Sequence, residues 1–219
     1  MLWSSILRNA LGLALFAAVT VGVIAVTEVG TRDAITEQRE AARRRALLEI
    51  LPAEAFDNAI LEDVVAVDAP ALGLKESEEA FIARRAGEPV AAMLPLRVPD
   101  GYSGEIRLVL GVRPDGRIVG VRALEHRETP GLGDKIEARK SDWILTFADR
   151  SLGDPPAEQW AVRKDGGSFD GFTGATVTPR AVVGGVYRAL DWFEREGREA
   201  LFGAADIPGT DGATESSGQ

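Results

Sequence analysis

The sequence contains no cysteine and a single histidine, His126, among its 219 residues. Without cysteine the chain cannot form disulfides, bind zinc through thiolates or ligate an iron–sulfur cluster. One histidine is also too few for a histidine-rich metal site. Basic residues are outnumbered, because 25 Lys and Arg face 34 Asp and Glu and the formal net charge is −9. The chain as a whole therefore lacks the basic surface that nucleic-acid binding requires.

An uncharged run lies near the N-terminus, between Arg8 and Glu28. Its roughly 19 residues, at ~1.5 Å each in a helix, reach about 29 Å and match a hydrocarbon layer of ~30 Å. The alternative is a signal peptide, whose apolar core covers only ~7–15 residues before a small-x-small cleavage site. The run is longer than that, and Thr27-Glu28-Val29-Gly30 is a poor cleavage site. We therefore predict an uncleaved transmembrane helix over residues 9–29.

Basic residues flank both ends of this segment, so the charge pattern alone leaves its orientation open. Arg8 and the amino terminus favour a cytoplasmic N-terminus, whereas five arginines crowd the opposite end between residues 32 and 45. Residues 30–52 are predicted to continue as a juxtamembrane helix that Pro52 ends. Its run Arg43-Arg44-Arg45 is typical either of a contact with lipid headgroups or of a solvated helix face.

Beyond Pro52 the hydrophobic pattern changes to strand-like spacing. Apolar and β-branched residues recur in short runs separated by turn residues, and Pro114-Asp115-Gly116 is typical of a hairpin turn. The pattern predicts an antiparallel sheet with one face on a core. The predicted strands cover residues 80–84, 89–96, 105–112 and 117–124, with a further short strand at 159–164.

Two helices are predicted within this part of the chain. Asp134 suits the N-cap of a helix that runs through Ala148. A second, amphipathic helix follows Pro179 and ends near Gly197. Their predicted inward residues are Ile136, Trp143, Ile144 and Phe147 in the first, and Val182, Val183, Val186, Leu190 and Phe193 in the second. Residues 204–219 are rich in Gly, Ser, Thr and acidic residues, so we expect them to be disordered.

The stretch from Asp170 to Pro179 combines small residues with hydroxyl groups just before the second helix. It reads Asp-Gly-Phe-Thr-Gly-Ala-Thr-Val-Thr-Pro. Thr178 suits the N-cap position and Pro179 the first helical position. Free backbone N–H groups and the positive end of the helix dipole would then favour an anion, above all a phosphate, at this loop. The alternative, a plain capped helix after a glycine turn, explains Thr173 and Thr176 poorly.

A second segment, Glu-Thr-Pro-Gly-Leu-Gly at residues 128–133, follows the last predicted strand of the hairpin series. Gly131 and Gly133 would let the backbone approach a ligand closely. From the residues alone, this segment is interpreted equally well as a connector between a strand and a helix.

Both segments resemble the signatures of a known family. Asp170-x-x-Thr173-Gly174-Ala175-Thr176 resembles the flavinylation motif Asp-x-x-(Ser/Thr)-Gly-Ala-Thr of FMN-binding domains, and residues 128–133 resemble their second signature. With the anchor and the Thr-Pro-Arg-Ala-Val-Val continuation, they resemble RnfG, the flavin-carrying component of the Rnf (Rsx) ion-translocating electron transport complex. The equivalent FMN subunit of the sodium-translocating NADH:quinone reductase shares both motifs and is one alternative. A non-redox, membrane-anchored scaffold protein is an alternative from a different class.

The resemblance implies that one FMN is attached through its phosphate to the hydroxyl of Thr176. A dedicated flavin transferase would make this bond and would recognise Asp170 and Thr173. Thr178 competes for the acceptor role, although its position suits capping better. The remaining residues expected to bind the cofactor are Gly174 and Ala175 in the motif, and Glu128, Thr129, Gly131 and Leu132 against the flavin.

The resemblance also implies an α+β fold, with one N-terminal transmembrane helix followed by an FMN-binding domain that has an antiparallel sheet and packed helices. The expected order is a cytoplasmic N-terminus (1–8), the transmembrane helix (9–29), the juxtamembrane helix (30–52), a periplasmic FMN-binding domain (53–203) and the tail (204–219). The protein would lie in the bacterial inner membrane, among the other membrane and peripheral subunits of the complex. It would relay electrons where transfer between NADH and ferredoxin is coupled to Na⁺ or H⁺ movement. We assign no catalytic residue and interpret His126 as structural.

Overall fold

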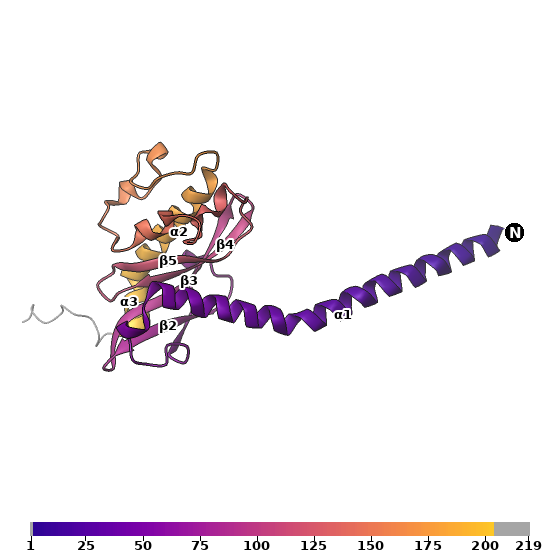
Figure 1. Ribbon diagram of the computed structural model, residues 1–219, viewed down its shortest axis with the longest axis horizontal. Coiled ribbons are helices and arrows are strands. Elements are labelled where there is room, and N and C mark those ends of the chain that lie inside the picture. Colours follow the sequence, from indigo (N-terminus) through magenta and orange to yellow (C-terminus); the bar gives the residue numbers. More distant parts are fainter. Residues whose placement is uncertain (1, 204–219) are drawn as a thin grey trace, which may run out of the picture. The chain divides into compact units, whose positions relative to one another are not determined.

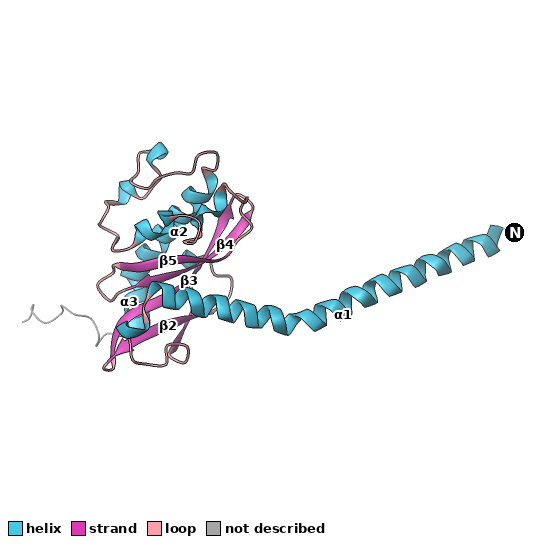
Figure 2. Ribbon diagram, viewed as in Figure 1, coloured by secondary structure: helices cyan, strands magenta, loops and turns pink. Residues whose placement is uncertain are grey.

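The chain folds into a long N-terminal helix followed by an antiparallel sheet with helices packed on it (Figures 1 and 2). The structure is a computed structural model that describes residues 2–203, without the side chains of residues 2, 4, 5, 32–36, 39 and 40. The tail predicted to be disordered, residues 204–219, lies outside the described residues. The architecture confirms the predicted α+β class with one N-terminal apolar helix.

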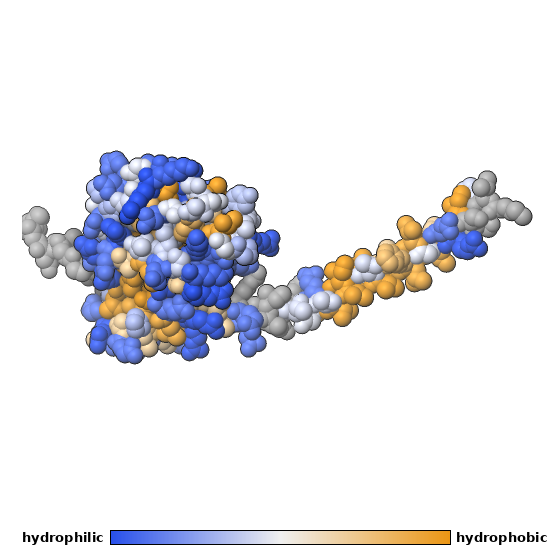
Figure 3. Space-filling view, turned by 45° about the horizontal axis from the view of Figure 1, so that its top comes forward, coloured by the Kyte–Doolittle hydropathy of each residue, from blue (hydrophilic) through white to orange (hydrophobic). Residues whose placement is uncertain are grey.

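Helix α1 runs from Leu2 to Ile50, and the chain divides into two units, residues 1–43 and 44–219. In the first unit, Ile6–Thr31 is long and apolar enough to cross a membrane, and Figure 3 shows its hydrophobic surface. The hydroxyls of Thr20, Thr27 and Thr31 donate to carbonyl oxygens one turn earlier at 2.8 to 2.9 Å. These hydroxyls are therefore satisfied within the helix, as an apolar surrounding demands.

Five strands form an antiparallel meander in the order β1-β2-β3-β4-β5. The four predicted strands are present as β2 (Glu78–Arg85), β3 (Glu88–Gly101), β4 (Gly104–Val112) and β5 (Ile118–Glu125). The prediction missed β1 (Val64–Val67), a four-residue strand at the edge of the sheet in which only Val67 is buried. So short and exposed a strand has no clear alternation of apolar and polar residues.

One face of the sheet carries the main core. Alternate residues of β3 and β4 point into it, and α2 (Val177–Trp192) packs over them with the predicted apolar stripe (Figure 1). Burying one such side chain contributes about 1.5–3 kcal/mol, so this layer dominates the stability of the domain. The strand residues of this core are Ala92, Leu94, Leu96 and Val98 of β3, and Ile106, Leu108, Leu110 and Val112 of β4.

The opposite face of the sheet receives the last turns of α1. Leu47 and Ile50 belong to a second buried cluster with Phe81 of β2, Met93 of β3 and Val109 of β4. The end of α1 therefore belongs structurally to the folded domain, and the sheet lies between it and α2.

Two glycines and an arginine fix this end of α1. Gly111 and Gly120 pair across β4 and β5, and a β-carbon on Gly111 would lie 2.7 Å from Ile50 Cγ2. Arg122 Nη2 donates to the Glu49 carbonyl at 3.1 Å, and its Nε lies 3.2 Å from the Glu49 carboxylate. Arg122 thus caps the C-terminus of α1, where a cation is favourable.

The segment after β5 is not the single helix predicted from Asp134 to Ala148. It forms two short 3-10 helices, η3 (Gly133–Ile136) and η4 (Asp142–Phe147). The Ser141 hydroxyl accepts the Trp143 N–H at 3.2 Å and so starts a separate turn, a role that short hydroxyl side chains favour. Asp134 lies inside η3 instead of capping a helix. The four residues predicted to point inward, Ile136, Trp143, Ile144 and Phe147, are all buried.

The strand predicted at residues 159–164 is also wrong. This part of the described chain forms η5 (Ala157–Gln159), η6 (Arg163–Asp165) and a single bridge between Val162 and Phe169. The loop closes on itself, because a β-carbon on Gly167 would lie 1.9 Å from the Ala161 carbonyl oxygen. Its apolar residues reach the core without joining the sheet.

Helical structure continues past Gly197, where an end was predicted. A π-helical turn, Phe193–Gly197, follows α2 and leads into α3 (Arg198–Phe202). A β-carbon on Gly197 would lie 2.6 Å from the Trp192 ring. This glycine therefore makes room for an indole and does not end the helix.

Gly111→Ala is expected to destabilise the domain, because the added methyl group would collide with the stiff, β-branched side chain of Ile50. Overpacking of this kind costs about 1–3 kcal/mol. Gly120→Ala is the matched control, since its β-carbon would lie 3.4 Å from Ile50 Cγ2. Thermal unfolding of the detergent-solubilised chain measures both variants. Equal melting temperatures for the two would contradict the close packing of α1 on this glycine pair.

Candidate functional site

Buried aromatic side chains hold the start of the threonine-rich segment. Phe172 is buried and meets Trp143 edge-on, with the ring centroids 4.9 Å apart. The Trp143 indole N–H donates to the Asp170 carbonyl oxygen at 2.7 Å. The Asp170 carboxylate remains exposed and lies 3.1 Å from Arg163 Nε. The backbone here is fixed while the Asp170 side chain stays accessible.

A tight turn follows and brings Thr173 and Gly174 to the surface. The Ala175 N–H donates to the Phe172 carbonyl oxygen at 3.1 Å, so Thr173 and Gly174 are the central residues of a β-turn. Gly174 has a φ of +82°, which glycine adopts without strain at the third position of a turn. Both central residues are exposed, and Ala175 is partly buried.

Helix α2 begins at Val177, two residues earlier than predicted. Thr176, and not Thr178, occupies the N-cap, and its side chain makes no capping hydrogen bond in the described structure. Pro179 is the third helical residue, where an N–H would have had no helical partner in any case. The hydroxyl of Thr176 therefore lies at the start of the helix but does not cap it.

Thr178 does not cap the helix, because a distant residue takes its hydroxyl. Its side chain is fully buried and donates a short hydrogen bond to Glu128 Oε2. The other carboxylate oxygen, Oε1, accepts the Ser103 N–H at 3.0 Å. Glu128 is itself only 4% exposed. One buried carboxylate thus joins the β3–β4 hairpin, the 128–133 segment and the first turn of α2.

Two glycines make room for this carboxylate. A β-carbon on Gly101 would lie 2.9 Å from Glu128 Oε1. A β-carbon on Gly133 would lie 2.8 Å from both Glu128 Oε2 and Thr178 Oγ1. The close approach predicted at Gly133 is therefore made by two side chains of the protein itself.

The 128–133 segment forms a turn that lies against the β-turn at residues 172–175, the threonine turn. The Thr129 carbonyl oxygen accepts the N–H groups of Leu132 and Gly133 at 3.1 and 3.0 Å, and Gly131 has a φ of +77°. Leu132 is 41% exposed, and a β-carbon on Gly174 would lie 3.6 Å from Leu132 Cδ2. The two segments that resemble the family signatures are therefore neighbours in space.

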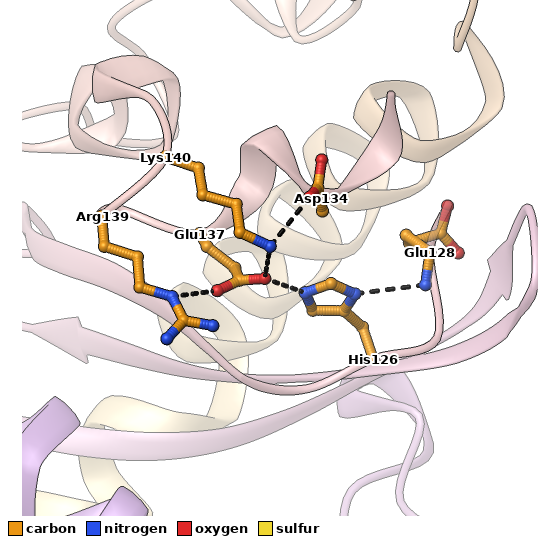
Figure 4. A network of polar contacts seen from close by, with 6 residues as sticks. All are labelled: His126, Glu128, Asp134, Glu137, Arg139 and Lys140. Carbon is orange, nitrogen blue, oxygen red and sulfur yellow. Dashed lines mark hydrogen bonds and ion pairs between the residues drawn. The ribbon is translucent and has the colours of Figure 1, made fainter. Parts of the chain in front are cut away.

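A network of charged side chains adjoins this turn (Figure 4). His126 Nδ1 accepts the Glu128 N–H at 3.2 Å, so Nε2 carries the proton and faces Glu137 Oε1 at 3.2 Å. Lys140 donates to Glu137 at 2.7 Å and to Asp134 at 2.8 Å. The hydrogen bond from Lys140, with another from the Gly131 backbone, holds the pKa of Asp134 below its ordinary value. These contacts support the interpretation of His126 as a structural residue.

Sequence reasoning missed several partners that hold the site together. Ser103 contributes only a backbone N–H, and Gly101 contributes only space, so neither has a side-chain signal to find. Arg180 of α2 forms two hydrogen bonds of 2.5 Å with the Asp165 carboxylate, which ties the preceding loop to the helix. Only the fold brings these residues together.

The arrangement suits a phosphate ester that carries an apolar ring. The start of α2 offers backbone N–H groups and the positive end of the helix dipole to a negative charge beside the Thr176 hydroxyl. Leu132 and Val177, 41% and 43% exposed, provide apolar surface next to the same turn. These residues fit a flavin whose phosphate is held at the helix start.

Known proteins match this chain over nearly its whole length. Residues 101–191 match the FMN-binding domain family, and residues 1–50 match the RnfG N-terminal region. A protein of Pseudomonas aeruginosa, named as the G subunit of the ion-translocating oxidoreductase complex, is 50% identical over 206 residues, 94% of this chain and 96% of its own. Proteins of the same name from Shewanella loihica and Vibrio atlanticus are 46% and 43% identical, over 86% and 90% of this chain and 90% and 95% of theirs.

The two family matches cover separate parts of the fold. The N-terminal match covers α1, and the FMN-binding match contains both the 128–133 turn and the threonine turn. They favour RnfG over the related quinone-reductase subunit, and a flavoprotein over a non-redox scaffold. This chain belongs to the RnfG family, the G subunits of the ion-translocating oxidoreductase complex, and carries an FMN-binding domain.

Proposed function

We propose that this protein is the FMN-carrying electron-relay subunit of a membrane complex that couples electron transfer between NADH and ferredoxin to translocation of Na⁺ or H⁺. Membership of the RnfG family supports an electron-transfer role among other subunits of such a complex. The FMN supplies the ability to accept and pass on electrons singly or in pairs. The protein's own residues tether and orient the cofactor, and we assign it no separate substrate.

The FMN is attached through its phosphate to Thr176. The observation that carries this proposal is the position of Thr176 at the N-cap of α2 with a hydroxyl that makes no capping bond in the described structure. A flavin transferase would use a flavin dinucleotide, so that the Thr176 Oγ–P bond forms as the diphosphate bond breaks, and the hydroxyl proton passes to the transferase. The phosphodiester keeps one negative charge, which the helix N-terminus stabilises.

The other motif residues take two different roles. Asp170 and Thr173 are exposed, and the small residues Gly174 and Ala175 that follow leave space around the turn. The transferase can therefore reach and recognise it. Glu128 and Thr178 are buried and hold the start of α2 in place. The residues that would lie against the flavin are Thr129, Gly131 and Leu132.

The protein is anchored in the bacterial inner membrane by α1, with the N-terminus in the cytoplasm and the FMN-binding domain in the periplasm. The span proposed from the sequence, 9–29, applies to this arrangement, and the periplasmic domain takes in the last turns of α1 together with residues 53–203. The last turns of α1, docked on the sheet, would join the anchor to the flavin domain without a loop.

Thr176→Ala is expected to abolish covalent flavin, because no acceptor hydroxyl remains at the helix start. The full chain, co-expressed with the transferase, should give a flavin-fluorescent band that survives SDS, and the variant should give none. Thr146→Ala, which changes an exposed threonine elsewhere in the same domain, is the control and should stay fluorescent. Mass spectrometry of the tryptic peptide 165–180 should place one FMN on Thr176. A label on Thr173 or Thr178 would overturn the assignment.

Thr178→Val is expected to lower the stability of the domain while keeping the shape of the side chain. The substitution removes the hydroxyl that donates to buried Glu128, and hydrogen bonds to charged groups contribute about 1.5–3 kcal/mol. Chemical unfolding should show that loss, and covalent flavin per chain should fall. Thr146→Val is the matched control, because its hydroxyl donates to a carbonyl that is only partly buried. Unchanged stability in Thr178→Val would show that the hydrogen bond to Glu128 does not stabilise the start of α2.

The absence of natural cysteine allows a direct test of the membrane orientation. A membrane-impermeant maleimide should label Ser77→Cys, which is exposed in the folded domain, in intact spheroplasts. Ser4→Cys should be labelled only after lysis. The reverse pattern would place the flavin domain in the cytoplasm.

A further inference from the structure

Tyr102 is the most exposed large apolar side chain among residues 44–203, at 69%. It lies at the tip of the hairpin between β3 and β4. An aromatic ring is costly to leave in water, so a ring as exposed as this one indicates a contact surface. Leu132 and Val177 are two more such side chains, and they come from the segments that meet this hairpin at Glu128.

The hairpin tip is held firmly in place. Gly101 pairs with Gly104, and a β-carbon on Gly101 would lie 2.3 Å from the Gly104 carbonyl oxygen. The next residue after Tyr102, Ser103, donates its N–H to buried Glu128 at 3.0 Å. The backbone on both sides of Tyr102 is therefore fixed, and its ring extends from this fixed tip into solvent.

The same carboxylate brings this tip close to the start of α2. Glu128 binds Ser103 through one oxygen and Thr178 through the other, so a single carboxylate separates the hairpin from the helix. Thr176 lies two residues before Thr178. A ring joined to the Thr176 oxygen through a phosphate and a ribityl chain can reach the hairpin tip.

We propose that Tyr102 forms one wall of the site for the flavin ring, opposite the apolar surface of Leu132 and Val177. This inference rests on the proposed attachment of FMN to Thr176. The phenol ring would lie against the ring system of the cofactor, shield it from water and bring an electron-rich side chain into contact with it. Such a contact quenches flavin fluorescence through reversible electron donation, with no net reaction.

Native fluorescence per covalent flavin tests this arrangement in the full-length, detergent-solubilised protein. The flavin content comes from the SDS-resistant band, and native emission and iodide quenching are then compared at equal flavin. Tyr102→Leu should emit severalfold more strongly than the natural protein and be more accessible to iodide. Tyr102→Phe keeps a ring but is a poorer electron donor, so it should emit more while staying shielded. Leu145→Ala, which changes another exposed apolar side chain of the domain, should behave like the natural protein.

Each alternative gives a different result. Equal native emission and equal iodide quenching in Tyr102→Leu and the natural protein would overturn the inference, while leaving the attachment to Thr176 intact. Unchanged emission together with weaker copurification of other subunits would instead assign Tyr102 to a protein contact. If Tyr102→Leu takes up no flavin, the same comparison is made with Tyr102→Phe. A natural protein without covalent flavin would overturn the proposed function and this inference with it.

Discussion

The buried carboxylate of Glu128 is the contact on which the whole site depends. A carboxylate taken out of water is costly unless hydrogen bonds replace its hydration. Here Ser103 N–H and the Thr178 hydroxyl supply those bonds, one to each oxygen. Because its donors come from two distant parts of the chain, Glu128 can be buried at low cost only when the hairpin, the 128–133 turn and α2 are all in place.

This dependence explains why the site is assembled from residues with such different properties. Gly101 and Gly133 leave space for the carboxylate, and larger side chains at either position would displace it. The residues that would touch the flavin, such as Leu132, have exposed side chains on turns that these hidden contacts position. A substitution far from Thr176 in the sequence, at Gly101 for example, would therefore disturb the site by displacing Glu128.

The sequence predicted the parts of the fold that depend on local pattern. The hairpin strands and the apolar stripe of α2 follow from spacing alone, and the flavin motif from its particular residues. Two of the errors come from side-chain contacts that the local pattern does not show. Thr178 has every local property of an N-cap, but Glu128 takes its hydroxyl. Gly197 has the local property of a helix end, but it accommodates the ring of Trp192.

The N-cap of α2 shows how a departure from local preference points to function. A threonine in this position usually stabilises its helix by about 0.5–2 kcal/mol through a side-chain bond to the backbone. Thr176 makes no such bond in the described structure, and the first turn is held by the contact between Thr178 and Glu128 instead. A hydroxyl that is not needed for stability can be esterified without unfolding the helix that it precedes. Natural sequences give up local stability mainly at functional positions, and compensate for it with contacts nearby. Thr178 stabilises the first turn through its buried hydrogen bond, and this leaves the Thr176 hydroxyl, two residues earlier, available for attachment.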